Sequence, residues 1–162
     1  MPAAHVLTPF HSTRHDHARC VTDALARAER HCTAKGLRLT ALRRRVLEIV
    51  LRRHAPIGAY EILEELGGGH AAPPTVYRAL AFLIDAGFVH RLRTRNAFVG
   101  CGAPQPSHAS QFLICRRCDA VAEITDAAIA RALSRSALAL GFHLDEPVIE
   151  MAGLCRACTA HG

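Results

Sequence analysis

Four of the seven cysteines in this 162-residue chain form two C-x-x-C pairs. Cys115 and Cys118 lie in FLICRRCD, and Cys155 and Cys158 lie in GLCRACTA. A single pair at this spacing can be a redox couple, a disulfide anchor or half of a metal site. Two pairs whose sulfurs can meet at one centre supply the four thiolates of a closed tetrahedral zinc site. The spacing therefore predicts a structural zinc ion that holds the ends of a small domain together.

A second set of ligand types is dispersed along the chain: His90, Cys101, His108 and Glu123. One thiolate, two imidazoles and one carboxylate also suit tetrahedral zinc. Taken singly, each has an ordinary interpretation as a surface or core residue, and spacing alone leaves both interpretations open. Because the set flanks the junction between two expected domains, a zinc ion bound by all four residues could change the relative orientation of these domains.

Composition narrows the choice of partner and compartment. The chain has 20 Lys and Arg against 14 Asp and Glu, a net charge of +6 and a pI near 9.3, which favours an anionic partner, and nucleic acid before a membrane surface. No apolar run approaches the roughly 18 residues of a membrane span, and the N-terminus lacks the order of a signal peptide. We therefore expect a cytoplasmic protein whose thiols stay reduced, which favours metal ligation over disulfides.

The elements that must position these residues begin with a helical domain. Apolar periodicity predicts helices over residues 16–35, 41–53, 59–66 and 73–87, with Thr40 as the N-cap of the second helix and Tyr60, Leu63 and Leu66 inward on the third. Two short runs, 88–92 and 96–100, predict a hairpin. Helices followed by a hairpin are typical of a winged helix. Amphipathic helices with scattered arginines would look similar, but the basic excess over residues 35–95 favours the winged helix.

The remaining sequence predicts a second domain and completes an α+β fold. Strand-like runs QFLICRRC, AVAEIT and FHLDEPVIEMAGLC surround a helix in TDAAIARALSRSALAL. The expected organisation is a flexible extension over residues 1–17, a winged-helix DNA-binding domain over 18–99, a linker over 100–110 and a small α/β zinc-binding dimerisation domain over 111–162. Cys20 and Cys32 have no cysteine within one helical turn, so we expect small core or surface residues rather than ligands.

Several segments resemble the ferric uptake regulator superfamily of bacterial metal-dependent repressors, and within it the zinc uptake regulator branch. They are GLRLT, PPTVYRAL, GFVH, the HASQFLICRRC run and VIEMAGLCRAC, and the resemblance extends from about Ala18 to Cys158. It implies an N-terminal winged helix, a C-terminal dimerisation domain and repression of metal-uptake genes when metal is replete. It also implies a regulatory zinc ion bound at His90, Cys101, His108 and Glu123, the positions where this branch has its His, Cys, His and Glu ligands.

Three departures from the family pattern refine these expectations. The iron-sensing branch has an HHDH stretch before its first cysteine pair, and this chain has PSHASQ, which argues against iron. LTALRRR lacks the Pro-Gln-Arg that is common in the family, which bears on one backbone contact to DNA and not on the fold. The histidine-rich tail of some members is absent, since the sequence ends in AHG.

The function expected from the resemblance is that of a homodimeric, zinc-responsive repressor with two zinc ions per subunit and a pseudo-palindromic operator of double-stranded DNA. Thr75, Tyr77 and Arg78 would approach bases and phosphates, and Arg38 and the Arg43–Arg45 cluster would approach the DNA backbone. Arg44, Arg52 and Arg53 fit a merely solvated face equally well. No membrane or small-molecule substrate is expected.

Two other functions compete with this one. A zinc enzyme with Glu123 as general base lacks an H-E-x-x-H helix or a deaminase signature, and four protein ligands leave no position for an activated water. A member of the same superfamily that responds to another metal or to peroxide is the nearer alternative, and a metal titration of DNA binding separates it.

Overall fold

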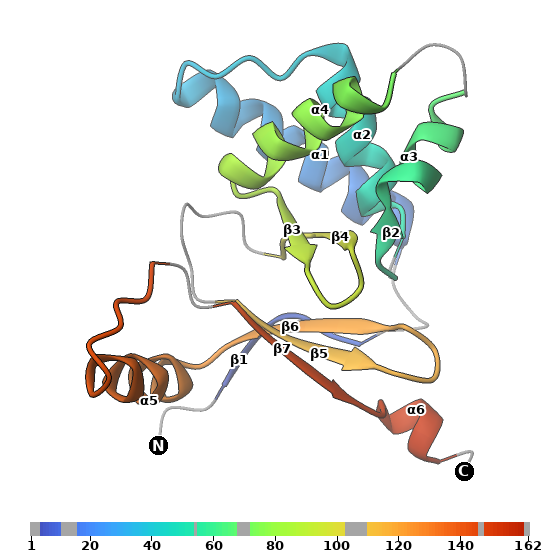
Figure 1. Ribbon diagram of the computed structural model, residues 1–162. Helices are drawn as coiled ribbons and strands as arrows, with labels where there is room; N and C mark the ends of the chain where they lie inside the picture. Colours follow the sequence, from blue (N-terminus) through green and yellow to red (C-terminus); the bar gives the residue numbers. More distant parts are fainter. Residues whose placement is uncertain are drawn as a thin grey trace. The chain divides into compact units, whose positions relative to one another are not determined.

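The computed structural model describes residues 4–10, 16–53, 55–67, 72–102, 110–145 and 148–160 (Figure 1). The chain divides into two compact units, one of residues 12–106 and one of residues 1–11 together with 107–162. The chain therefore passes from one unit to the other twice. Within the described ranges, no helix combines the length and apolar character that a membrane crossing requires.

The unit of residues 12–106 contains the predicted helices and hairpin. Its elements are α1 (His17–Ala34), α2 (Ala41–Leu51), β2 (Ile57–Gly58), α3 (Ala59–Glu65), α4 (Pro73–Asp85), β3 (Val89–Leu92) and β4 (Ala97–Gly100). β3 and β4 pair antiparallel, and the short β2 pairs with the other edge of β4. Helices followed by this hairpin are the winged-helix arrangement, which confirms the predicted fold class.

Local signals in the sequence fix where these helices begin. The Asp16 side chain accepts a hydrogen bond from the backbone N–H of Arg19 at 3.1 Å and caps α1. Thr40 Oγ1 accepts from the backbone N–H of Arg43 at 3.4 Å and caps α2, as predicted. Pro73 occupies the first turn of α4, where a missing N–H costs no helical hydrogen bond.

One apolar core joins the helices of this unit. The apolar stripe of α1 is buried as a whole: Val21, Leu25, Ala28 and Cys32. The buried positions of α4 are Val76, Ala79, Leu80 and Leu83. On α3 the prediction for Tyr60 is wrong, because its side chain is 69% exposed while Ala59 and Ile62 face the core. A seven-residue helix offers few buried positions. The small Ala59 occupies the buried position that was predicted for Tyr60.

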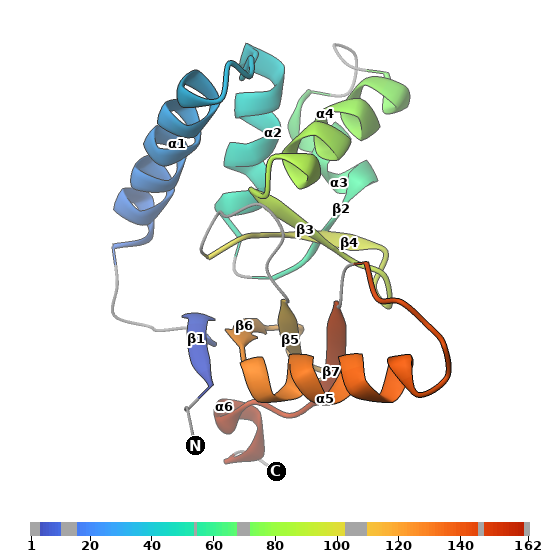
Figure 2. The ribbon, with the colours of Figure 1, turned by 90° about the vertical axis from the view of Figure 1, so that its left-hand side faces the viewer.

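The second unit is built on one mixed sheet with the strand order β1-β6-β5-β7. Its elements are β1 (His5–Thr8), β5 (Gln111–Cys115), β6 (Val121–Thr125), α5 (Ala127–Leu138), β7 (Ile149–Gly153) and α6 (Arg156–Thr159). β6 pairs antiparallel with both β1 and β5, and β7 pairs parallel with β5. In Figure 2, α5 runs crosswise in front of β5 and β7.

The N-terminal residues depart from the expected flexible extension over residues 1–17. His5–Thr8 form the edge strand β1, and His17 is the first residue of α1. The physical reason is that β6 would otherwise present unpaired backbone groups at a sheet edge, which an extended segment can satisfy. His11 and His15, two of the histidines in that expected extension, lie outside the described residues.

Candidate metal centres and nucleic-acid interface

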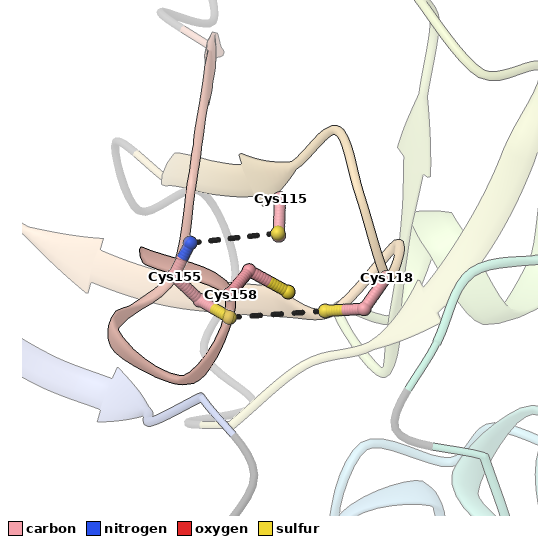
Figure 3. A group of neighbouring side chains, drawn as sticks. All are labelled: Cys115, Cys118, Cys155 and Cys158. Carbon is pink, nitrogen blue, oxygen red and sulfur yellow. Dashed lines mark hydrogen bonds between the residues drawn. The ribbon is translucent and has the colours of Figure 1, made fainter. Parts of the chain in front are cut away.

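The four C-x-x-C cysteines converge on one point of the second unit (Figure 3). Cys115 is the last residue of β5 and Cys118 lies in the following turn, while Cys155 caps α6 and Cys158 lies within it. Their four sulfur atoms all lie within 4.8 Å of one another, and the sulfurs of Cys118 and Cys155 are 3.8 Å apart. This clustering is what the sequence spacing predicts for a four-thiolate site.

Local backbone structure holds each pair in place. After the first pair, Asp119 adopts a left-handed conformation with φ of +56°, and its N–H donates to the Cys115 carbonyl at 3.0 Å. At the second pair, Thr159 donates to the Cys155 carbonyl from its N–H at 2.9 Å and from its hydroxyl at 2.7 Å. The first pair is thus positioned by a tight turn, and the second pair by the short helix α6.

The surroundings of the sulfurs shift the pKa values of the Cys115 and Cys158 thiols in opposite directions. Backbone N–H groups, first that of Cys155 and then that of Arg117, point at the Cys115 sulfur and lower the pKa of its thiol to about 6. Burial, followed by hydrogen bonding with Cys118, raises the pKa of the Cys158 thiol to about 12. Four thiolates therefore need a cation between them, and a thiophilic divalent ion fits this donor set.

Three arginines are neighbours of these cysteines in the sequence and can complement the charge of the cluster. Arg116, Arg117 and Arg156 are exposed beside the cysteines, and Arg117 donates to the Cys158 carbonyl at 2.9 Å. Four thiolates around one Zn²⁺ carry a net charge of −2, so nearby arginines stabilise the loaded site. The residues present therefore fit a structural zinc ion.

The candidate regulatory ligands of the winged-helix unit lie on the hairpin. His90 is in β3 and pairs with Val99 of β4, and Cys101 follows β4 with its N–H donating to the Phe88 carbonyl at 2.9 Å. Residues two apart on a strand share a face, so His90, Val99 and Cys101 lie on the same side of the hairpin. Ligand atoms of His90 and Cys101 come within 4.8 Å of each other.

The other two candidate regulatory ligands follow in the chain. Glu123 is in the middle of β6, only 2% exposed, and its Oε1 accepts a hydrogen bond from the Ser110 hydroxyl at 3.1 Å. A buried carboxylate is costly unless hydrogen bonds or a cation compensate its charge, which suits a metal ligand. His108 lies outside the described residues.

The candidate DNA-binding residues of α4 lie at the surface of the winged-helix unit. Tyr77 and Arg78 are exposed and Thr75 is half-buried. Within the described ranges, the side chains of these three residues have no hydrogen-bond or ion-pair partner. The same holds for the exposed Arg38, whose carbonyl alone is engaged. These groups are free to bind an external acceptor.

Several arginines of α2, and the two arginines that directly follow it, are instead engaged within the unit. The guanidinium of Arg43 lies 3.7 Å from the centre of the Phe82 ring and donates to the Arg38 carbonyl at 2.6 Å. Arg44 is paired with Glu29 at 2.7 Å.

Two further arginines, Arg45 and Arg52, both bind Glu48. The hydrogen bond from Arg45 is the largest cause of the lowered pKa of the Glu48 carboxyl. Arg53 binds Glu61 and Glu65. The intramolecular partners of this arginine cluster favour the solvated-face interpretation for most of it.

Two residues near the proposed metal sites were not predicted from the sequence. Ser110 donates to Glu123, and Phe10 packs against the four-cysteine cluster. The signal for Ser110 was its place as a polar residue just before the predicted strand-like run QFLICRRC. Phe10 had no comparable signal, because its partners lie more than a hundred residues away in the sequence.

Three features together define a class of protein, the metal-binding transcription regulators. They are the winged-helix unit, its exposed arginines Arg38 and Arg78 without a side-chain partner among the described residues, and the four-thiolate cluster. Comparison with known proteins narrows this class. The sequence model of the ferric uptake regulator family matches residues 34–152. The zinc uptake regulation protein of Escherichia coli (strain K12) is 41% identical over 139 residues, which cover 84% of this chain and 81% of that protein.

Solved structures give the same result. A zinc uptake regulator complexed with zinc and DNA is 40% identical, with a TM-score of 0.82 over 87% of this chain and 96% of that one. The holo form of XcZur is 42% identical, with a TM-score of 0.80 over 85% of this chain and 98% of that one. The chain belongs to the ferric uptake regulator family.

Proposed function

We propose that this protein is a zinc-responsive transcriptional repressor of zinc-uptake genes, which binds a pseudo-palindromic operator as a homodimer when zinc fills a regulatory site. The observation that carries the proposal is the likeness, at 40% identity over most of both chains, to a zinc uptake regulator complexed with zinc and DNA. The donor chemistry of this chain agrees with it, since thiolate, imidazole and carboxylate side chains favour zinc.

Each subunit would hold two zinc ions with different roles. Cys115, Cys118, Cys155 and Cys158 would bind the structural ion, which leaves no open coordination position. His90, Cys101, His108 and Glu123 would bind the regulatory ion. Bound zinc supplies a compact divalent centre that draws four ligands into a tetrahedron.

The regulatory ligands come from different parts of the chain, and this gives the site its proposed effect. His90 and Cys101 belong to the unit of residues 12–106, whereas Glu123 and, by its number in the sequence, His108 fall in the range of the other unit. By sharing one ion, these side chains would restrain the two units relative to each other. In a dimer, this restraint would favour one distance and one orientation between the two α4 helices, which must reach major grooves about 34 Å apart.

DNA contacts would come from residues of the winged-helix unit whose side chains have no partner among the described residues. Thr75, Tyr77 and Arg78 of α4 would read bases and phosphates, and Arg38 would bind the backbone. Arg43 stays in the proposed interface as a residue that positions Arg38, because its guanidinium holds the Arg38 carbonyl.

The alternatives are a regulator of the same family that responds to another metal or to peroxide, and a zinc enzyme. A four-ligand site leaves no position for an activated water, so we propose no catalytic role. We also propose that the protein acts in the cytoplasm, where DNA is accessible and thiols stay reduced.

The test is an operator titration at buffered free zinc, together with a zinc count per subunit, on the unmodified protein and on Cys101→Ser. The unmodified protein should hold about two ions and Cys101→Ser about one, because a hydroxyl replaces a thiolate ligand. Cys101→Ser should keep its fold and lose the zinc-dependent step in operator affinity.

Cys20→Ser is the matched control, since Cys20 is an exposed cysteine of α1 outside both ligand sets. It should behave as the unmodified protein. A full zinc response in Cys101→Ser would contradict the proposed regulatory site, and a stronger response to iron or manganese than to zinc would support the alternative regulator.

A further inference from the structure

The N-terminal residues 5–10, called here the N-terminal strap, are an integral part of the second unit. β1 pairs antiparallel with β6, with His5 opposite Thr125, Val6 opposite Ile124 and Thr8 opposite Glu123. The register shifts between Val6 and Thr8, as at a β-bulge. The family match begins at residue 34, so the strap lies outside the segment that defines the family.

The end of the strap reaches the four-cysteine cluster. Phe10, two residues beyond β1, is partly buried and packs against a group of buried residues formed by Cys115, Ala120 and Cys155, with Cys158 beside it. Three of these four partners are ligands of the proposed structural zinc. The side chain of Phe10 therefore lies against residues whose sulfur atoms are the proposed zinc ligands.

We infer that the strap is a functional part of the zinc site, with Phe10 shielding the thiolates and slowing loss of the ion. This inference rests on the proposed occupancy of the four-cysteine site by zinc. An incoming chelator or oxidant must approach a sulfur or the metal itself, and an apolar side chain packed over the ligands obstructs that approach. The apolar cover also lowers the local dielectric, which strengthens the attraction between thiolates and a divalent cation.

A plainer interpretation is that the strap only closes the sheet edge at β6. The two roles reside in different residues and can be separated. Strand pairing depends on the backbone of β1 and tolerates loss of a mostly exposed side chain such as Val6, which is 53% exposed. The shielding role depends on the Phe10 ring.

The experiment measures zinc release from the full-length protein into excess chelator, in the unmodified form and in Phe10→Ala, Phe10→Leu and Val6→Ala. The same series is made with Cys101→Ser, so that release from the regulatory site is not counted. Phe10→Ala should release the structural zinc about 10-fold faster or more, the size of effect typical of residues that support metal ligands. Phe10→Leu keeps an apolar cover and should largely restore slow release, and Val6→Ala should match the unmodified rate.

Deletion of residues 1–10 should release zinc at least as fast as Phe10→Ala. Equal release rates in all forms, with zinc present at the start, would overturn the inference and leave the strap as an edge strand. Protein purified without zinc in the four-cysteine site would instead contradict the proposed function, so the two failures are distinguishable. Circular dichroism of each variant establishes that the fold is retained.

Discussion

At the scale of single residues, the arginines proposed to bind DNA differ from the ion-paired arginines of this protein in having no acidic neighbour among the described residues. Arg44 and Arg53 are tied to Glu29 and to Glu61 and Glu65, whereas Arg78 on α4 has no such partner among the described residues. An arginine that is already paired must give up an ion pair to bind a phosphate. One that is unpaired loses only its hydration.

The residue-scale prediction compares these two kinds of arginine. Arg78→Ala should weaken operator binding by about 1–3 kcal/mol if Arg78 reads a base edge, with the fold and both zinc ions retained. Arg44→Ala is the control and should change affinity by less, because its guanidinium is engaged by Glu29. A gel-shift titration at fixed salt compares the two variants, and an unchanged affinity in Arg78→Ala would remove Arg78 from the interface.

The sequence predicted those features of the sites that depend on local patterns. Short segments of the sequence were enough to predict the two C-x-x-C pairs, the starts of two helices near Asp16 and Thr40, and the hairpin that carries His90. Tyr60 was misplaced because a seven-residue helix carries too little periodicity to define its buried face. Phe10 was missed because its contacts with Cys115 and Cys155 depend on how distant strands come together.

At the scale of elements, the hairpin is positioned by a close approach between β4 and α2. A Cβ at Gly100, the last residue of β4, would lie 2.6 Å from Leu51 Cδ2, so only glycine fits without displacement. Cys101 comes next in the chain, and its N–H is bonded to the Phe88 carbonyl. The glycine therefore permits close packing of β4 against Leu51 immediately before a proposed zinc ligand.

The element-scale prediction is that Gly100→Ala destabilises the protein by about 1–3 kcal/mol through overpacking against Leu51. It should also weaken regulatory zinc binding, because the end of β4 shifts and carries Cys101 with it. Gly153→Ala is the control, since a Cβ there meets nothing within 4 Å, and its effect on stability should stay within about 0.5 kcal/mol. Thermal unfolding and zinc titration of both variants test this, and equal behaviour of the two would contradict it.

The β1 strand shows why the boundary of a domain is harder to predict than its core. A strand of four residues is too short to show a periodic pattern of apolar residues. Its pairing partner β6 lies more than a hundred residues away in the sequence. The energy that orders such a segment comes from satisfying the open edge of β6 and from burying Phe10, and both appear only when the sheet has formed.

At the scale of the whole molecule, the proposed dimer has a physical basis in the helix α5. Ile129, Leu133 and Ala137 recur at helical spacing, yet none of the residues of this helix is buried in the single chain. Leu133 is 39% exposed, and the segment that follows exposes Phe142 at 60%. An amphipathic helix gains most of its stability by burying its apolar face, so this face calls for a second copy of the chain as its cover.

The whole-molecule prediction follows from this unfilled face. Leu133→Glu should convert the dimer to a monomer, because a carboxylate would have to lose its hydration inside an apolar interface. The structural zinc should remain, since its cysteines lie elsewhere in the unit. Operator affinity should fall steeply, because each half-site must then bind a winged helix independently, without the second one held at the matching groove. Sedimentation velocity and zinc content are compared with Leu37→Glu, which places the same charge at a 41%-exposed leucine of the other unit and should leave the dimer intact. The gel-shift titration compares Leu133→Glu with the unmodified protein, because Leu37 adjoins the proposed DNA contact Arg38. A Leu133→Glu protein that sediments as a dimer would show that the subunits meet through another surface.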